Sequence, residues 1–564
     1  MRKVLQQLKQ YKRNAFLCIG MTALEVIMEI LMPFVTAIII DQGLEAANLP
    51  VVYRYGILIV AMAVLSLIFG ALAGKNAASA SAGLAANLRE AIYANIQTFS
   101  FSNIDKFSVP GLVTRMTTDI TNVQNAFMMI IRVAVRAPLN LIFSFPMCLY
   151  INVQLSWMFL IAVAFLMIVI GVIMVVTLRI FNRVFKKYDD LNASVQENVT
   201  AIRVVKAFVR EDYEDKKFSK ASNTLYKMFV KAEGLLAFNN PAMMVAVYFC
   251  IISVSWFGAQ FIVGGTLSTG DLTSLFSYIM ALLMSLMMLS MVVVMISMSL
   301  ASIRRISEVL SETPDLKDPE HPVMEVKDGQ IDFNHVNFSY KHGSGKNALS
   351  DIDLHIKSGE TIGVIGGTGS GKSSLVNLIC RLYDVDDGSV CVGGVDVRQY
   401  DTEVLRNQVS VVLQKNTLFS GSILQNLRWG NPDATEEDCI EACKAACADE
   451  FIDRMPEGYR TRIERGGNNV SGGQKQRLCI ARALLKKPKV LILDDSTSAV
   501  DTATDAKIRR AFAEKIPGTT KIIIAQRISS VESADRILVL DDGKIDAFDT
   551  HENLLKNNAI YQEI

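Results

Sequence analysis

The chain has 564 residues, of which 51% are hydrophobic and 20% are charged, and its formal net charge is +1. This apolar content excludes an ordinary soluble enzyme, and the balanced charge gives no support for a nucleic-acid partner. The nine cysteines follow no disulfide framework or usual zinc spacing, which favours a reducing compartment and argues against a structural metal.

The first 300 residues hold six apolar stretches that are each long enough to cross a bilayer. The short connections between them lack Lys and Arg, whereas the long connections, 75–127 and 179–240, are basic. Both long loops and both termini are therefore expected in the cytoplasm. The sequence predicts a multi-pass, all-α domain of the cell membrane over residues 1–311, opening with an interfacial helix. The six spans are expected near 15–40, 51–74, 128–151, 155–178, 241–264 and 271–300.

Charged side chains recur at helical spacing inside two of the predicted spans. Glu25 and Glu29 share one face of the first span, and Arg132 and Arg136 share one face of the third. Two interpretations are open: a structural role, as an ion pair or with Arg132 reaching the headgroups, or a charged wall of a substrate cavity.

The sixth span carries a stripe of methionines at steps of three and four residues. Methionine is flexible and polarisable, so the stripe suits either a seam between helices or a route for varied apolar ligands. Its members are Met280, Met284, Met287, Met291, Met295 and Met298.

A polar, proline-containing linker at 312–328 precedes a second half, 329–564, in which short apolar strands alternate with helices. This alternation predicts a cytoplasmic α/β domain with a largely parallel sheet. Strand 361–365 leads into a G-x-x-x-x-G-K-S loop and then a helix, the context of a phosphate-binding P-loop. Its backbone N–H groups would cradle phosphates, Lys372 would reach the β- and γ-phosphates, and Ser373 would bind Mg²⁺. The site residues are Gly366, Gly367, Thr368, Gly369, Ser370, Gly371, Lys372, Ser373 and Ser374.

Three further residues fit a site for ATP and Mg²⁺. Asp494 ends a buried strand and is expected to help hold Mg²⁺. Tyr340 is placed to stack on adenine, although a buried structural tyrosine is equally consistent with its position. Gln414 follows another strand, where it would contact Mg²⁺ or the attacking water; the alternative is a satisfied polar residue at a strand end.

The order and spacing of these motifs resemble the ABC exporter family, and the resemblance covers nearly the whole chain. It implies a half-transporter, two of which pair so that each ATP lies between the P-loop of one half and the SGGQ signature of the other. The signature here is Ser471-Gly472-Gly473-Gln474, and Ser498 and Asp501 match the family's D-loop. The other matching segments are Tyr340, the P-loop, Gln414, Glu464-Arg465-Gly466, 491–495, 524–527, 110–119 and 197–218.

Two positions depart from the family pattern. Asp495 replaces the glutamate that polarises the attacking water, and Gln526 replaces the histidine that contacts the γ-phosphate. The aspartate is shorter by about 1 Å, a misplacement that can cost roughly 10²-fold in rate. Gln526 cannot carry a positive charge. A weakly hydrolytic site is expected; the alternative is that this half hydrolyses adequately with Asp and Gln.

Both departures occur together in one half of bacterial heterodimeric ABC exporters, whose partner half has the glutamate, the histidine and a damaged signature. The resemblance therefore implies a degenerate-site subunit that exports small amphipathic, drug-like compounds, with hydrolysis mainly in the partner's composite site. Its expected partner is a second, non-identical half-transporter. Alternatives are a regulatory subunit, an ATP-gated channel or sensor, and an exporter of lipid or peptide.

Overall fold

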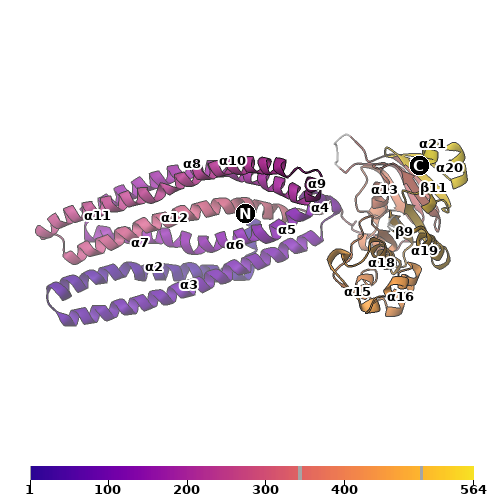
Figure 1. Cartoon of the computed structure of the whole chain (residues 1–564). Coiled ribbons are helices and arrows are strands. Elements are labelled where there is room, and N and C mark those ends of the chain that lie inside the picture. The colour runs from indigo at the N-terminus through magenta and orange to yellow at the C-terminus, as the bar shows by residue number, and fades with distance from the viewer. Residues whose placement is uncertain (1, 341–345, 496–499, 564) are drawn as a thin grey trace. The chain divides into compact units, whose positions relative to one another are not determined.

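The computed structural model describes residues 2–340, 346–495 and 500–563, with some positions in 178–193 and 290–298 given by their backbone alone. The chain forms two compact units. The first comprises Met1–Gln97 and Ser108–Glu312, and the second comprises Thr98–Phe107 and Thr313–Ile564. Figure 1 shows long helices in the first unit and a sheet-containing domain in the second.

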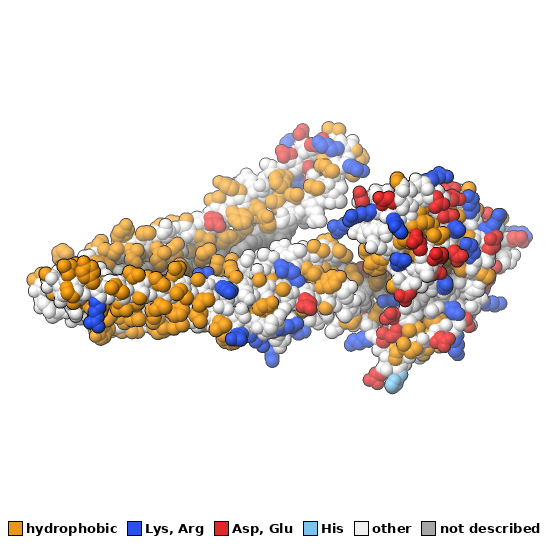
Figure 2. All heavy atoms as spheres, turned by 90° about the horizontal axis from the view of Figure 1, so that it is seen from below, with side chains coloured by type: hydrophobic (Ala, Val, Ile, Leu, Met, Phe, Trp, Pro, Cys, Tyr) orange, Lys and Arg blue, Asp and Glu red, His pale blue; other side chains and the backbone are white. Residues whose placement is uncertain are grey.

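The first unit is all-helical, and its long helices lie side by side (Figure 1). Among the described residues, six helical segments are long and apolar enough to cross a membrane, as predicted. Hydrophobic side chains cover much of the surface of these helices in Figure 2. The main helices are α2 (Lys12–Ile38), α3 (Leu49–Gln97), α6 (Ile120–Met129), α7 (Val135–Ile151), α8 (Val153–Thr200), α10 (Glu211–Ala237), α11 (Asn239–Val263) and α12 (Thr269–Val309).

Three π-helical turns interrupt the helices of this unit: η2 (Ile39–Glu45), η3 (Arg115–Asp119) and η4 (Ile130–Ala134). Each adds a residue to the local turn and so changes which side chains share a face. In η2, the Asp41 carboxylate accepts hydrogen bonds from the Ser268 hydroxyl (2.6 Å) and the Gly270 N–H (2.8 Å). Asp41 thereby ties the end of the first span to the start of α12.

Small residues allow α2 and α3 to pack closely. Cys18 on α2 and Ala73, Ala77 and Ala80 on α3 are almost fully buried. In a bilayer there is little hydrophobic driving force between helices, so such small side chains favour association by letting backbones approach. This contact fixes the position of the charged residues that α2 carries.

The second unit contains the predicted α/β domain, built on a six-stranded sheet in the order β12-β11-β3-β10-β9-β6. All neighbouring strands pair in parallel except β11 with β12. The central strands read as continuous apolar runs because both faces of the sheet are covered. They are β3 (Thr361–Gly366), β6 (Val409–Val412), β9 (Val490–Asp494), β10 (Thr520–Ile524), β11 (Arg536–Asp541) and β12 (Lys544–Asp549).

A second, four-stranded antiparallel sheet, a two-stranded sheet and a group of helices also belong to this unit. The sheet has the order β2-β1-β4-β5, from β1 (Ile331–Phe338), β2 (Leu349–Ile356), β4 (Asp387–Val392) and β5 (Val395–Asp396). Its helices include α13 (Lys372–Ile379), α15 (Ile423–Leu427), α16 (Glu436–Ala445), α18 (Gly472–Leu484) and α19 (Thr502–Lys515).

The segment that joins the two halves in sequence is held by the second unit. The guanidinium of Arg381, which is only 2% exposed, pairs with Asp318 (3.3 Å) and Asp384 (3.1 Å). It also donates to the carbonyl oxygen of Lys317 (2.9 Å). The polar linker therefore contributes charge partners to a buried arginine.

Candidate nucleotide-binding site

The glycine-rich loop lies between β3 and α13, as the sequence predicts. Gly369 and Gly371 have φ of 85° and 97°, a region that L-residues rarely adopt. A Cβ on Gly371 would lie 2.8 Å from the carbonyl oxygen of Ala348. Glycine at this position lets the loop turn sharply into α13, whose first N–H groups and positive end then face a phosphate site.

Lys372 is folded back over this loop. Its Nζ donates to the carbonyl oxygens of Gly366 and Gly367, each at 2.7 Å, and lies 3.3 Å from the Ser370 hydroxyl. Burial lowers the pKa of Lys372, an effect that the nearby Asp494 and Asp495 oppose. A triphosphate would supply the counter-charge that this partly buried ammonium needs.

Asp494 ends β9 and is 7% exposed. Burial raises the pKa of this carboxyl, whereas the Ser373 hydroxyl lowers it. Ser373 and Asp494 are thus close together, as predicted. A hydroxyl and a carboxylate are oxygen ligands that fit Mg²⁺, and a bound cation would favour the ionised form of Asp494.

The two departures from the family pattern meet at one carboxylate oxygen. Asp495 Oδ2 accepts a hydrogen bond from Gln526 Nε2 at 2.8 Å and another from Gln414 Nε2 at 3.3 Å. The backbone of Asp495 has φ of 47°, and its carbonyl oxygen accepts from Gln476 Nε2 at 3.3 Å. Asp495, Gln414 and Gln526, which the sequence analysis singled out separately, are therefore joined by hydrogen bonds. Both donors are uncharged amides.

Tyr340 lies beside the start of α13. Its hydroxyl is 3.0 Å from the Ser374 hydroxyl, and its ring meets the rings of Phe338 (4.9 Å) and Tyr383 (5.1 Å) edge-on. The side chain is about half exposed, which leaves part of it accessible. The buried structural tyrosine considered above does not describe this residue.

Tyr383 is a neighbour of the site that sequence reasoning missed. Its hydroxyl donates to Asp105 at 2.8 Å, and its ring contacts Phe101; both residues lie in α4 (Phe101–Phe107), which belongs to the second unit. Burial and Asp105 raise the pKa of Tyr383. Helix α4, a segment of the first long loop, therefore contacts Tyr383, whose ring in turn contacts Tyr340.

The signature residues form the start of α18. The Ser471 hydroxyl accepts from the Gln474 N–H (3.3 Å), while the Gln474 side chain accepts from the Ser471 N–H (2.9 Å). This capping box leaves the next N–H groups of the helix unpaired. Ser471 and Gly472 are exposed, and Gly473 follows them, so the helix offers its positive end to an external anion.

The D-loop is described only in part. Asp501 caps α19, because its Oδ1 accepts a hydrogen bond from the Thr504 N–H at 3.0 Å. Ser498 lies outside the described residues.

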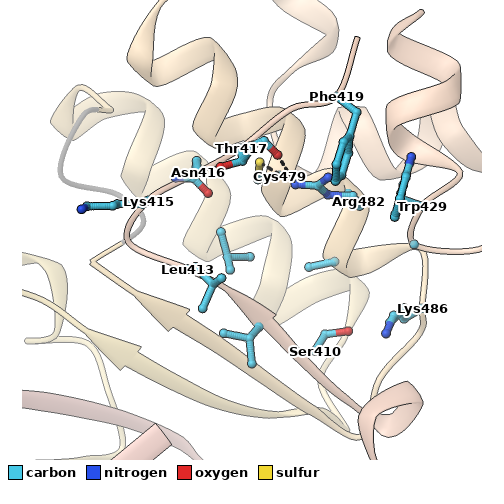
Figure 3. Close-up of a pocket in the computed structure, with 14 residues that line it drawn as sticks. Ser410, Leu413, Lys415, Asn416, Thr417, Phe419, Trp429, Cys479, Arg482 and Lys486 are labelled. Carbon is cyan, nitrogen blue, oxygen red and sulfur yellow. Dashed lines mark hydrogen bonds between the residues drawn. The ribbon is translucent and has the colours of Figure 1, made fainter. Parts of the chain in front are cut away.

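A pocket of about 310 Å³ lies beside β6 and the residues that follow it (Figure 3). The rings of Phe419 and Trp429 stack at 4.2 Å on its rim. Arg482 donates to the carbonyl oxygen of Thr417 at 3.0 Å. Sequence reasoning gave no signal for this hollow, which lies on the same strand end as Gln414.

In the membrane unit, Arg136 holds both predicted carboxylates. Its Nη1 lies 3.0 Å from Glu25 and its Nη2 lies 2.6 Å from Glu29. Three of the four charges therefore form an ion cluster, whereas Arg132 rests against Gly74 of α3.

The methionine stripe lies on α12 and is largely uncovered within this unit. Met280, Met284, Met287 and Met291 are exposed, and Met295 is half-buried. Met298 belongs to the same helix.

Residues 15–302 match the ABC transporter transmembrane region, and residues 349–498 match the ABC transporter ATPase domain. The chain belongs to the ABC transporter family. It is a half-transporter, with one transmembrane region and one ATPase domain, and a multi-pass membrane protein of the ATP-driven exporter class. An ABC ATPase domain binds ATP, normally with Mg²⁺.

Several curated proteins are similar along most of this ABC half-transporter. An uncharacterized ABC transporter ATP-binding protein, YfiB of Bacillus subtilis, is 35% identical over 564 residues, 100% of this chain and 98% of that protein. An ATP-dependent lipid A-core flippase of Desulfotalea psychrophila is 34% identical over 80% of this chain and 78% of its own length. A fatty acid ABC transporter ATP-binding/permease protein of Mycobacterium bovis is 31% identical over 80% of this chain and 71% of its own.

The fold is that of a bacterial Atm1-family ABC exporter. A solved structure of such an exporter with ATP bound superimposes with a TM-score of 0.83 over 98% of both chains, at 23% identity. The predicted fold class, a six-span helical domain fused to a P-loop ATPase domain, is confirmed.

Gly371→Ala is expected to weaken ATP binding by about tenfold or more, because the left-handed backbone and the contact with Ala348 force the loop to move. Gly518→Ala is the matched control, since no heavy atom lies within 4 Å of its Cβ position. Equilibrium binding of MgATP to the purified chain measures both variants. Equal affinities for the two would contradict the loop geometry described here.

Proposed function

We propose that this chain is the degenerate-site subunit of a heterodimeric ABC exporter that moves amphipathic, drug-like compounds out of the cell. One observation carries the proposal: the side chains at the two departing positions, Asp495 and Gln526, face each other at 2.8 Å. A glutamate and a histidine at these positions would present a longer base and a cation to the γ-phosphate. Here a short carboxylate is occupied by neutral amide donors.

This network favours holding ATP over cleaving it. A general base must accept a proton from the attacking water, and Asp495 Oδ2 already accepts from two amides. Gln526 donates a hydrogen bond but adds no positive charge where charge develops. The P-loop, Lys372, Ser373 and Asp494 retain the features needed to bind MgATP. The site would therefore stay loaded while hydrolysis occurs elsewhere.

The intact signature supplies the second half of the argument. Ser471 and Gly472 are exposed at the positive end of a 13-residue helix, as a group that completes a partner's site must be. A homodimer would contain two slow sites and no fast one. A partner with the glutamate and the histidine would gain a sound signature from this chain.

The substrate proposal rests on the exposed methionine face of α12 and the charges on α2 and the third span. Flexible, polarisable side chains tolerate varied apolar ligands. A lipid or fatty acyl substrate is the second candidate, favoured by the names of two relatives, a lipid A-core flippase and a fatty acid transporter. With both termini in the cytoplasm, ATP-driven closure of two ATPase domains would open the spans outward.

The first test compares the chain with its complex. Purified alone, the chain is expected to bind ATP with little turnover, because Asp495 and Gln526 limit its own site. Co-purified with the second half-transporter, the complex is expected to hydrolyse ATP briskly. Steady-state phosphate release measures both. Turnover by the isolated chain at the rate of the complex would remove the degenerate-site proposal.

The second test assigns each motif to its site. Ser471→Ala and Gly472→Ala are expected to abolish most hydrolysis by the complex, since these residues complete the partner's site. Lys372→Ala is expected to remove one bound nucleotide per complex and leave appreciable turnover. The number of nucleotides bound per complex and the rate of phosphate release distinguish the signature variants from Lys372→Ala. A larger loss of hydrolysis from the Lys372 change would reverse the assignment.

The third test restores the missing methylene. Asp495→Glu is expected to raise hydrolysis at this site by less than about tenfold, since groups that act as a unit are strongly non-additive. Gln526 stays neutral, and the partner's signature is expected to be altered. Single-site turnover is measured with the partner's own catalytic glutamate replaced by glutamine. Recovery of full activity would show that carboxylate length was the whole defect.

A further inference from the structure

Arg132 differs from Glu25, Glu29 and Arg136 because it makes no ion pair with the other charged residues of this cluster. Arg136 is occupied by Glu25 and Glu29. Arg132 is exposed, and within the described part of the chain no carboxylate lies within ion-pair distance of it. An exposed guanidinium facing hydrocarbon is costly, so intramembrane arginines usually face a wet cavity or an anionic partner.

The π-helical turn η4 explains why the two arginines have separate environments. In a regular α-helix, residues four apart lie on one face, and both arginines would point toward α2. The wider turn at Ile130–Ala134 changes their angle about the helix axis. Arg136 reaches α2, while Arg132 lies against α3, where a Cβ on Gly74 would be only 3.3 Å from its Nη1.

Glycines on α3 make room for both charged groups. Gly70, one helical turn from Gly74, accommodates Glu25, whose Oε1 would lie 3.0 Å from a Cβ there. Both oxygens of Glu29 accept from Arg136, and the second oxygen of Glu25 is buried. Glu29 and Arg136 are partly exposed but occupied by each other, so Arg132 is the exposed charge of this group that lies outside the ion cluster.

The depth of Arg132 fits a headgroup. In the proposed orientation it lies four residues from the cytoplasmic end of the span 128–151, which is about 6 Å along a helix. Gly74 of α3 is the last residue of the span that the sequence predicts at 51–74, so the expected ends of both spans place this point near the inner membrane surface. α12 packs against η4 and carries the exposed methionines, which offer an apolar surface for a tail.

We propose that Arg132 binds the anionic headgroup, a carboxylate or a phosphate monoester, of the amphipathic compound that is exported. This inference rests on the proposed export function and narrows its substrate class. The planar guanidinium matches the geometry of both groups and can form two parallel hydrogen bonds with either. In this proposal, the ion cluster around Arg136 positions the helices, and Arg132 selects compounds whose headgroup is negatively charged.

The test measures binding of dodecyl phosphate to the full chain in phosphatidylcholine nanodiscs, with dodecanol as the uncharged probe of equal length. Wild-type protein is expected to prefer dodecyl phosphate by about tenfold or more. Arg132→Gln is expected to reduce that preference to within about twofold, and Arg132→Lys to retain part of it. Equal preference in wild type and Arg132→Gln would overturn the proposal.

Lys75→Gln is the matched control, because Lys75 is exposed, adjoins Gly74 and carries the same charge at the same level. The Lys75→Gln variant is expected to keep the wild-type preference for dodecyl phosphate. A loss equal to that of Arg132→Gln would mean that general surface charge causes the preference, and would overturn the assignment to Arg132. Inorganic phosphate is not expected to displace the probe. Complete displacement by phosphate alone, or by phosphatidylglycerol in the disc, would overturn the assignment to an exported amphipath.

Further measurements distinguish a loss of headgroup binding from misfolding of the variant and from failure of the proposed function. Unchanged thermal unfolding and ATP binding of Arg132→Gln show that the variant is folded, and Arg132→Lys tests the charge without deleting it. If the chain alone and the complex differ in hydrolysis as proposed while the headgroup preference is absent, only the substrate class is wrong. If they do not differ, the degenerate-site proposal fails whatever dodecyl phosphate does.

Discussion

Parallel pairing of four neighbouring strands is the constraint on which the nucleotide site depends. In the order β3-β10-β9-β6, every carboxyl end lies at the same edge of the sheet. The P-loop follows β3, Gln526 follows β10, Asp494 ends β9 with Asp495 directly after it, and Gln414 follows β6. Residues more than 150 positions apart therefore meet without any long side chain having to reach across the domain.

The same constraint makes small changes at that edge consequential. Because the backbone positions are fixed by the sheet, loss of one methylene at Asp495 cannot be recovered by a shift of the strand. The side-chain amides of Gln414 and Gln526 both donate to the Asp495 carboxylate. Asp495, Gln414 and Gln526 thus form a hydrogen-bonded group at this edge, beside a phosphate loop that lies between β3 and α13.

Much of this arrangement could be predicted from the sequence, because its signals are local. Apolar length identifies a span, and the glycine spacing of the P-loop identifies a turn that only a phosphate site requires. The separate environments of Arg132 and Arg136 could not be predicted in this way, since the π-helical turn η4, which contains Arg132, leaves no clear mark in the sequence. Tyr383 was missed for a different reason: its contact with Asp105 joins segments 278 residues apart. The stacked pair Phe419 and Trp429 likewise depends on tertiary packing.

Arg381 bears on where the ATPase domain can be separated from the rest of the chain. A fragment that began at Gly329, where the first β-strand approaches, would lack Asp318 and Lys317 and leave a buried guanidinium with fewer of its partners. The C-terminal part of the second compact unit begins at Thr313 instead. The part of the polar linker that is free of the ATPase domain is therefore shorter than its composition implies. A proteolytic cut between Asp318 and Gly329 would separate Arg381 from covalently attached partners and so destabilise the domain.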